Sequence, residues 1–238
     1  MFRIIKLKNV LIALGLILIS VMCSIGIVAV VGSRSIPKPT YTIVVDAGHG
    51  GRDDGSSGVN GVKESQINLE IAKLLKSDLE TLGINVVLTR CDGNGLYKSN
   101  VDNYKQSDME ARMEIINKAS PDMVISIHQN AFNDRNQCGA QAFYQEQDEV
   151  SKGFADSVQS QLLSQLDNAK LESNKGDYYL LKESKLPAII VECGFLSNEN
   201  EEKLLATPEY QNKVAYAIMC GVVKYLISAE MTENLRNK

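Results

Sequence analysis

The chain has few residues of the two kinds that most often build structural metal sites. Only two of its 238 residues are histidines, and none of its five cysteines lies in a Cys-x-x-Cys pair. The missing pairs argue against a zinc ribbon or finger. We therefore expect Cys91, Cys138, Cys193 and Cys220 to be buried or free thiols. Metal chemistry in this chain has to rely on the two imidazoles together with carboxylates or a thiol.

The chain also has fewer basic than acidic residues. Apart from Arg3, Lys6 and Lys8, the chain has 22 Lys and Arg residues against 29 Asp and Glu residues, a net charge of −7. A nucleic-acid partner needs a basic face, so none is expected. The glycine-rich stretch at 48–51 lacks both the Gly-Lys-Ser/Thr and the Gly-x-Gly-x-x-Gly patterns, so it does not predict a nucleotide-binding loop.

One long apolar run stands near the N-terminus. Residues 10–32 contain no charged side chain and are long enough for a helix to cross a hydrocarbon core of about 30 Å. A cleaved signal peptide has a shorter apolar region of roughly 7 to 15 residues. We therefore interpret 1–32 as a membrane anchor, with cleavage after Gly32 as the alternative. Because three cations precede the run, we expect the remaining chain to be exported to the outer face of the membrane.

After this run the sequence predicts a tether, one domain and a tail. Residues 33–40 contain two prolines and favour an extended linker. Residues 41–228 alternate strand and helix patterns without an internal repeat, and 229–238 form the tail. Strands are expected at 41–46, 84–90, 122–127, 140–144, 178–182 and 188–191. Helices are expected at 64–82, 107–119, 151–166, 197–205 and 208–226.

This alternation predicts an α/β fold. We expect a mostly parallel, twisted sheet of about six strands with helices on both faces. For the helix at 107–119, Ser107 and Glu110 have the spacing of a capping box, which predicts that the helix begins there.

Ionisable side chains follow three of the expected strands. His49 comes after the strand at 41–46, His128 after that at 122–127, and Glu192 after that at 188–191. Ligands of open α/β sheets bind outside the carboxyl ends of the strands. The sequence therefore predicts an active site, with one zinc ion, at this edge of the sheet.

The residues alone leave several candidates for the third zinc ligand. Glu64, which opens the helix that follows the glycine-rich loop, is preferred. Asn68, one helical turn later, could steady the Glu64 carboxylate. The alternatives that remain open are Asp46, Asp53, Asp54 and Glu192.

Glu192 follows four apolar residues. A carboxylate buried there should have a raised pKa unless zinc or a cation compensates. Such a group suits a general base that deprotonates water and then protonates a leaving amine. The alternative is a structural ion pair, with Arg90 or Arg112 as the partner.

Four separated motifs, taken together, resemble one known family. They are Val-Val-Asp-Ala-Gly-His-Gly-Gly, then Glu64, then Ser-Ile-His-Gln-Asn-Ala, then Val-Glu-Cys-Gly-Phe-Leu-Ser-Asn. In this order they resemble the zinc-dependent N-acetylmuramoyl-L-alanine amidases. The resemblance implies that His49, Glu64 and His128 bind one zinc ion and that Glu192 is the catalytic glutamate. It also implies a peptidoglycan substrate, cut at the amide between N-acetylmuramic acid and the L-alanine of the stem peptide.

The compact form, with an N-terminal apolar segment and no wall-binding repeats, most resembles the spore-cortex and germination-specific amidases. That likeness implies removal of stem peptides before muramic-δ-lactam forms, in the forespore and cortex space, with an activating protein as a possible partner. We expect Asn68, Arg90 and Asn130 to contact substrate or to support the ligands. Gln129 and Lys182 depart from the residues common in the family, next to the site.

Two other functions would use the same residues. One is a zinc peptidase that cuts within the stem peptide. The other is a non-catalytic wall-binding protein that has kept the fold, although all three ligands and Glu192 are present.

Overall fold

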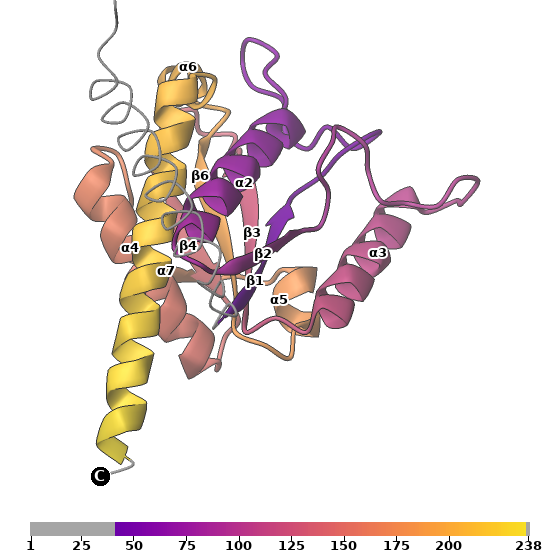
Figure 1. Cartoon of the computed structure of the whole chain (residues 1–238). Coiled ribbons are helices and arrows are strands. Elements are labelled where there is room, and N and C mark those ends of the chain that lie inside the picture. Colours follow the sequence, from indigo (N-terminus) through magenta and orange to yellow (C-terminus); the bar gives the residue numbers. More distant parts are fainter. Residues whose placement is uncertain (1–40, 237–238) are drawn as a thin grey trace, which may run out of the picture. The chain divides into compact units, whose positions relative to one another are not determined.

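A computed structural model describes residues 41–236, and the expected anchor and tether at 1–40 lie outside these residues. The described part is built on one six-stranded sheet (Figure 1). Its strands are β1 (Thr42–Ala47), β2 (Asn85–Leu88), β3 (Met123–Asn130), β4 (Gln141–Tyr144), β5 (Asn174–Lys175) and β6 (Ala188–Phe195). The strand order is β2-β1-β3-β6-β4-β5.

Strands β2, β1, β3 and β6 run parallel, whereas β4 pairs antiparallel with β6 and parallel with β5. The prediction of a mostly parallel sheet of about six strands is therefore confirmed, with one antiparallel pairing added.

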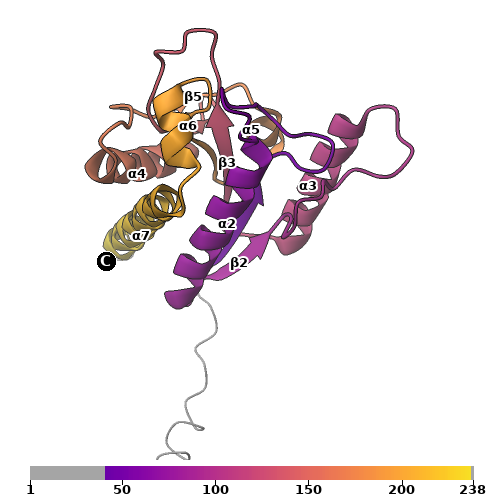
Figure 2. The ribbon, with the colours of Figure 1, turned by 90° about the horizontal axis from the view of Figure 1, so that it is seen from above.

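Helices cover both faces of the sheet (Figure 2). The helices are α2 (Glu64–Thr81), α3 (Tyr104–Ala119), α4 (Glu149–Gln165), α5 (Tyr179–Glu183), α6 (Glu199–Leu205) and α7 (Pro208–Arg236). Alternate residues of a strand point to opposite faces. Accordingly, Ile43 and Val45 pack with residues of α2, α4 and α7, whereas Val44 packs with residues of α3 and α5.

This division of the helices creates a switch point between β1 and β3. The chain leaves β1 through α2 on one face and returns to β3 through α3 on the other face. A crevice opens at the carboxyl ends of two parallel strands where the connections diverge in this way. The sheet topology thus places the expected site between the ends of β1 and β3.

Helix α3 begins earlier than the capping-box pattern predicts. Asn103 is the N-cap, and its side chain accepts a hydrogen bond from the backbone N–H of Gln106 at 3.1 Å. Ser107 lies inside the helix, where its hydroxyl accepts from the N–H of Lys98 at 3.1 Å. Asn caps helices at least as well as Ser does, so the earlier residue starts the helix.

The strand expected at 178–182 is wrong, because this segment forms the short helix α5. The N–H of Lys182 donates to the carbonyl of Tyr178, and the adjacent residues Leu180 and Leu181 are both buried. A strand would point these two leucines to opposite sides. Short apolar runs do not separate helix from strand by periodicity.

Helix α7 continues to Arg236, through most of the segment expected to be a tail. It has the length and apolar content of a membrane-spanning helix. However, Val214, Ile218 and Val222 are fully buried in the same core as residues of α2 and α4. We therefore describe α7 as a core helix of the domain.

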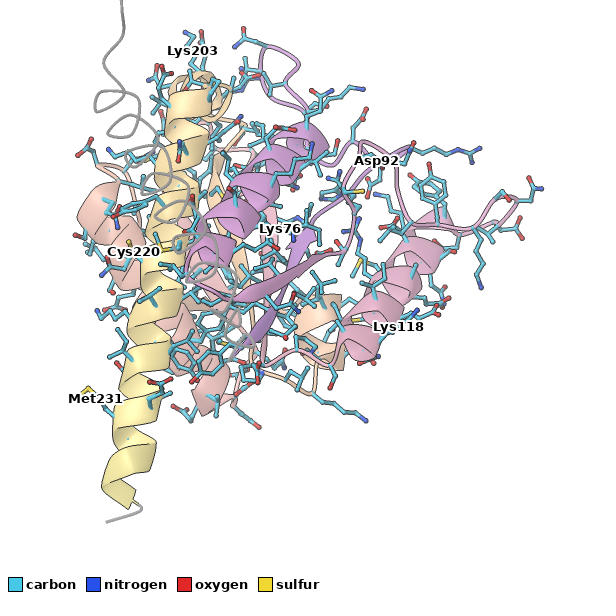
Figure 3. The ribbon with its side chains drawn as sticks, in the orientation of Figure 1. Lys76, Asp92, Lys118, Lys203, Cys220 and Met231 are labelled. Atoms are coloured by element: carbon cyan, nitrogen blue, oxygen red, sulfur yellow. The ribbon has the colours of Figure 1, made fainter. Side chains whose placement is uncertain are left out.

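The four cysteines in the described part of the chain are free, as expected. Cys193 is buried in β6, and Cys220 lies half-buried on α7, whose exposed end carries Met231 (Figure 3).

Candidate metal and catalytic site

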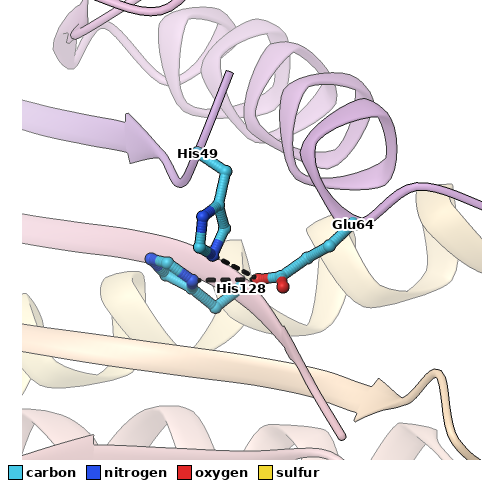
Figure 4. Close-up of side chains that lie close together, drawn as sticks. All are labelled: His49, Glu64 and His128. Atoms are coloured by element: carbon cyan, nitrogen blue, oxygen red, sulfur yellow. Dashed lines mark hydrogen bonds and ion pairs between the residues drawn. The ribbon is translucent and has the colours of Figure 1, made fainter. Parts of the chain in front are cut away.

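The carboxyl edge of the sheet brings two imidazoles and one carboxylate together. His49 lies two residues beyond β1, His128 lies in β3, and Glu64 is the first residue of α2. Glu64 Oε1 is 3.2 Å from His49 Nε2 and 3.0 Å from His128 Nδ1 (Figure 4). The three ligand atoms lie within 4.8 Å of one another, close enough to hold one metal ion. The cluster predicted from the sequence is therefore assembled by the fold.

The Glu64 carboxylate is buried and held by several donors. Its Oε2 accepts from the N–H of Ser56 at 2.7 Å, and its Oε1 accepts from the N–H of Gln129 at 3.1 Å. The expected contact with Asn68 is present, since Asn68 Nδ2 donates to Glu64 Oε1 at 3.3 Å and to the Gly48 carbonyl at 3.2 Å. These contacts fix the carboxylate between the two imidazoles.

The charges of the cluster shift the pKa values of its members. Burial raises the pKa of Glu64, but the hydrogen bonds and charges of His128 and His49 lower it well below its usual range. Burial lowers the pKa of His49, whereas Glu64 and Asp53 together raise it to about 9. Both groups therefore favour their charged forms when no metal is present.

Two glycines leave the space that the cluster needs. A Cβ on Gly48 would lie 2.4 Å from the His128 ring. A Cβ on Gly55 would lie 2.5 Å from Glu64 Oε2 and 2.7 Å from the His49 ring. Gly55 also has a φ of +71°, which favours glycine. The loop can therefore bring its backbone against the ligands only with glycine at these positions.

The alternative carboxylate ligands occupy other places. Asp46 is fully enclosed and pairs with Arg112 at 2.6 Å, and Asp54 pairs with Lys63 at 3.0 Å near the surface. Asp53 Oδ2 lies 2.7 Å from His49 Nδ1, on the far side of the ring from Glu64. Among these carboxylates, Glu64 is the one that faces both imidazoles.

The two buried arginines support the loop that carries His49. Arg112 donates to the carbonyls of Ala47 at 2.7 Å and His49 at 2.6 Å. Arg90 donates to the carbonyls of Ala47 at 2.8 Å and Gly48 at 2.9 Å. The alternative in which one of them pairs with Glu192 is wrong, because their donors bind backbone carbonyls and, for Arg112, other carboxylates.

Glu192 lies beside His128 in the sheet, because the two residues are register partners in β6 and β3. It is 6% exposed, and its Oε1 accepts a hydrogen bond from the Tyr178 hydroxyl at 3.2 Å. Its buried Oε2 has no partner among the described residues. Burial raises the pKa of Glu192, as expected from its strand.

A cavity of about 250 Å³ adjoins the cluster. It is lined by His49, His128 and Tyr178, and by the apolar side chains of Met109 and Leu180. A polar cluster next to an apolar cavity is typical of a site that binds and transforms a ligand.

The contacts of two site residues, Asp53 and Tyr178, were not predicted from the sequence. Asp53 was an alternative ligand, and its contact with the His49 ring depends on the turn of the loop, so no sequence pattern indicated it. Tyr178 was expected in a strand, and no sequence pattern indicated its contact with Glu192. Asn130 ends β3 and pairs with Phe195 of β6, and its contact with substrate stays a prediction.

The donor set suits zinc. Two imidazole nitrogens and one carboxylate oxygen, with room for a further ligand, are typical of catalytic zinc in hydrolases. The histidine side chains are 24% and 23% exposed, so the cluster is open on one side, whereas the Glu64 side chain is 3% exposed. The buried Glu192 Oε2, which has no partner in the described part of the chain, supplies a proton acceptor nearby. Fold and site together are those of a metal-dependent hydrolase built on a mostly parallel sheet.

Comparison with known proteins identifies the family. The model of the N-acetylmuramoyl-L-alanine amidase family matches residues 43–224. The chain belongs to this family, which favours the amidase over the stem-peptide peptidase and the non-catalytic binding protein.

Similar proteins cover nearly the same part of the chain. The germination-specific N-acetylmuramoyl-L-alanine amidase of Bacillus subtilis is 33% identical over 195 residues, covering 80% of this chain and 82% of the relative. The CwlD amidase of Clostridioides difficile, solved in complex with the GerS lipoprotein, is 39% identical with a TM-score of 0.76. That match covers 79% of this chain and 100% of the solved one. A further amidase structure, from Clostridium difficile 630, is 33% identical with a TM-score of 0.72, covering 80% of this chain and 98% of that one.

Proposed function

We propose that the chain binds one zinc ion through His49, Glu64 and His128 and uses Glu192 to hydrolyse the amide between N-acetylmuramic acid and L-alanine in peptidoglycan. The observation that carries this proposal is the cluster of three ligand atoms within 4.8 Å of one another, with Glu192 on the neighbouring strand. Zinc supplies Lewis-acid polarisation of an amide carbonyl and makes water easier to deprotonate.

The protein's own residues provide the proton transfers. Glu192 Oε2 has no hydrogen-bond partner within residues 41–236, so it can accept a proton from the attacking water. Because burial raises its pKa, the protonated form is accessible and can pass the proton to the alanine nitrogen as the C–N bond breaks. The adjoining cavity, lined by both imidazoles, Tyr178 and apolar side chains, offers a place for the substrate beside the cluster.

Analysis of the reaction products tests this function. Peptidoglycan digested with the zinc-loaded chain should release intact stem peptides with an L-alanine amino terminus, identified by mass spectrometry. A Glu192→Gln variant should bind the same amount of zinc and release none. Shortened stems would indicate a peptidase, and intact peptidoglycan with a zinc-replete wild type would support a wall-binding protein.

The similar proteins indicate a biological setting. We propose that the substrate is spore-cortex peptidoglycan and that stem removal precedes muramic-δ-lactam formation, because the relatives include a germination-specific amidase and CwlD. Spores of a strain that lacks the chain should then have cortex without muramic-δ-lactam. Wild-type amounts of the lactam would contradict the proposal.

A protein partner is also proposed. CwlD has been solved in complex with the GerS lipoprotein. We propose that this chain also binds an exported lipoprotein and that this partner activates it. Full activity of the purified, zinc-loaded chain alone on isolated cortex peptidoglycan would argue against an activator.

We propose that the apolar segment at 10–32 holds the domain on the outer face of the membrane. The chain should then sediment with membranes and be digested by a protease added to protoplasts. Recovery in the soluble fraction without residues 1–32 would instead indicate cleavage.

A further inference from the structure

The two oxygens of the Glu192 carboxylate have different surroundings. Oε1 accepts a hydrogen bond from the Tyr178 hydroxyl at 3.2 Å, whereas the buried Oε2 has no partner among the described residues. A carboxylate with one oxygen tied down cannot rotate freely about its terminal bond. The hydroxyl of Tyr178 therefore decides which oxygen stays available.

Packing holds the Tyr178 ring in place. The ring lies edge to face against Phe143, with ring centroids 5.7 Å apart and an angle of 69° between the planes. A Cβ on Gly176 would lie 2.5 Å from the Tyr178 ring, so the chain passes as close to the ring as glycine allows. Tyr178 also serves as the N-cap residue of α5, with an extended backbone. These contacts restrict the hydroxyl to the side of Glu192.

Besides contacting Glu192, Tyr178 faces the cavity next to the proposed metal ligands. Its side chain lines the cavity that His49 and His128 also line. Burial and the neighbouring Glu192 charge raise the pKa of the Tyr178 hydroxyl, so it stays protonated at neutral pH and acts as a donor. A residue that only filled space there would not need a hydroxyl directed at the carboxylate.

We propose that Tyr178 is a positioning residue for the reaction, whose hydroxyl fixes Oε1 of Glu192 so that Oε2 receives the proton of the attacking water. This inference rests on the proposed role of Glu192. Phe143 and Gly176 contribute to this positioning, because they pack against the ring that carries the hydroxyl.

Replacement of Tyr178 by phenylalanine tests the hydroxyl without disturbing the packing. Hydrogen bonds to charged groups contribute enough free energy for a change of about tenfold or more in rate. In the full-length, zinc-loaded chain, Tyr178→Phe should lower kcat for stem release about tenfold or more and change KM less than twofold. Zinc content and Tm should stay close to the wild-type values. Tyr216→Phe, a half-exposed tyrosine on α7, is the matched control and should leave kcat unchanged.

A crystal structure of the Tyr178→Phe variant gives a readout that does not depend on activity. The Glu192 carboxylate should turn away from its wild-type orientation or occupy two orientations. An unchanged carboxylate in the variant, or a wild-type kcat, would overturn the inference. An inactive wild type with a reoriented Glu192 in the variant would contradict the proposed function and leave the positioning role supported.

Discussion

At the scale of single residues, both ring nitrogens of His49 are contacted by carboxylates. Glu64 lies 3.2 Å from Nε2, and Asp53 lies 2.7 Å from Nδ1 on the other side of the ring. A carboxylate on the second nitrogen fixes the tautomer and the orientation of a metal-binding histidine. The two histidines and Glu64 could be predicted from strand ends and motif order. The role of Asp53 could not, because it depends on the turn of the loop.

The Asp53 contact predicts weaker metal binding when it is removed. Asp53→Asn should lower zinc affinity about 10- to 100-fold, as found when such supporting carboxylates are replaced. Competition with a chromogenic chelator measures the change. Asp54→Asn is the control, because Asp54 is a more exposed neighbour that pairs with Lys63. Equal zinc affinities for the two variants would contradict the role of Asp53.

The charged state of His49 predicts that zinc binding releases protons. Glu64 and Asp53 raise the pKa of His49 to about 9, although burial acts in the opposite direction. At pH 7 the metal-free imidazole is therefore protonated, and zinc has to displace that proton. Zinc affinity should consequently rise with pH up to about 9. Calorimetry at pH 7 in buffers of different ionisation enthalpy should detect proton release, and its absence would refute this assignment.

At the scale of elements, the junction between β1 and α2 decides the geometry. His49 has a φ of +60°, and the loop carbonyls on either side of it are held by Arg90 and Arg112. The sequence, with glycine at positions 48, 50 and 51, permits a sharp turn here. It did not show that two buried arginines hold the turn, because that pairing joins elements far apart in the chain.

The glycine at the end of β1 provides a test of this junction. Gly48→Ala would place a Cβ 2.4 Å from the His128 ring, so His128 or the loop must move. Zinc affinity should fall at least tenfold, and Tm should fall as well. Gly93→Ala is the control, because among the described residues no atom beyond Gly93 and its two chain neighbours lies within 4 Å of the added Cβ. It should change the free energy of unfolding by about 0.5 kcal/mol or less. A Gly48→Ala variant with normal zinc affinity would contradict the close approach.

At the scale of the whole molecule, the architecture followed from the alternation of apolar strands and amphipathic helices. The four parallel strands could be predicted, because buried parallel strands have continuous apolar sequences. The presence of helices on both faces of the sheet could be predicted from the same alternation. The strand β4 was expected at 140–144, but its antiparallel direction was not, because that direction depends on its pairing with β6. The segment of the short helix α5 was expected to be a strand. It is too short for periodicity to separate helix from strand, and its placement depends on packing against α3 and β6.

One buried ion pair links this architecture to acid stability. Asp46 of β1 pairs with Arg112 of α3. Burial raises the pKa of Asp46, but Arg112, Ser126 and Thr89 lower it to about 2. A lowered folded-state pKa stabilises the protein above the unfolded value near 3.8, and this contribution is lost as the pH falls towards 2.

Urea unfolding at pH 7 and pH 3 checks this contribution. At pH 7, Asp46→Asn should lose roughly 3 to 5 kcal/mol of unfolding free energy, because it leaves Arg112 without one buried partner. The loss should be smaller at pH 3. An equal loss at both pH values would show that the charge of Asp46 does not contribute.

Crystals of the zinc-loaded chain, measured at the zinc absorption edge, test whether His49, Glu64 and His128 hold one zinc ion beside Glu192. We expect one anomalous peak per chain, about 2.0 to 2.2 Å from two imidazole nitrogens and a Glu64 oxygen, with Glu192 outside the coordination sphere. A peak elsewhere, or one bound directly by Glu192, would contradict it.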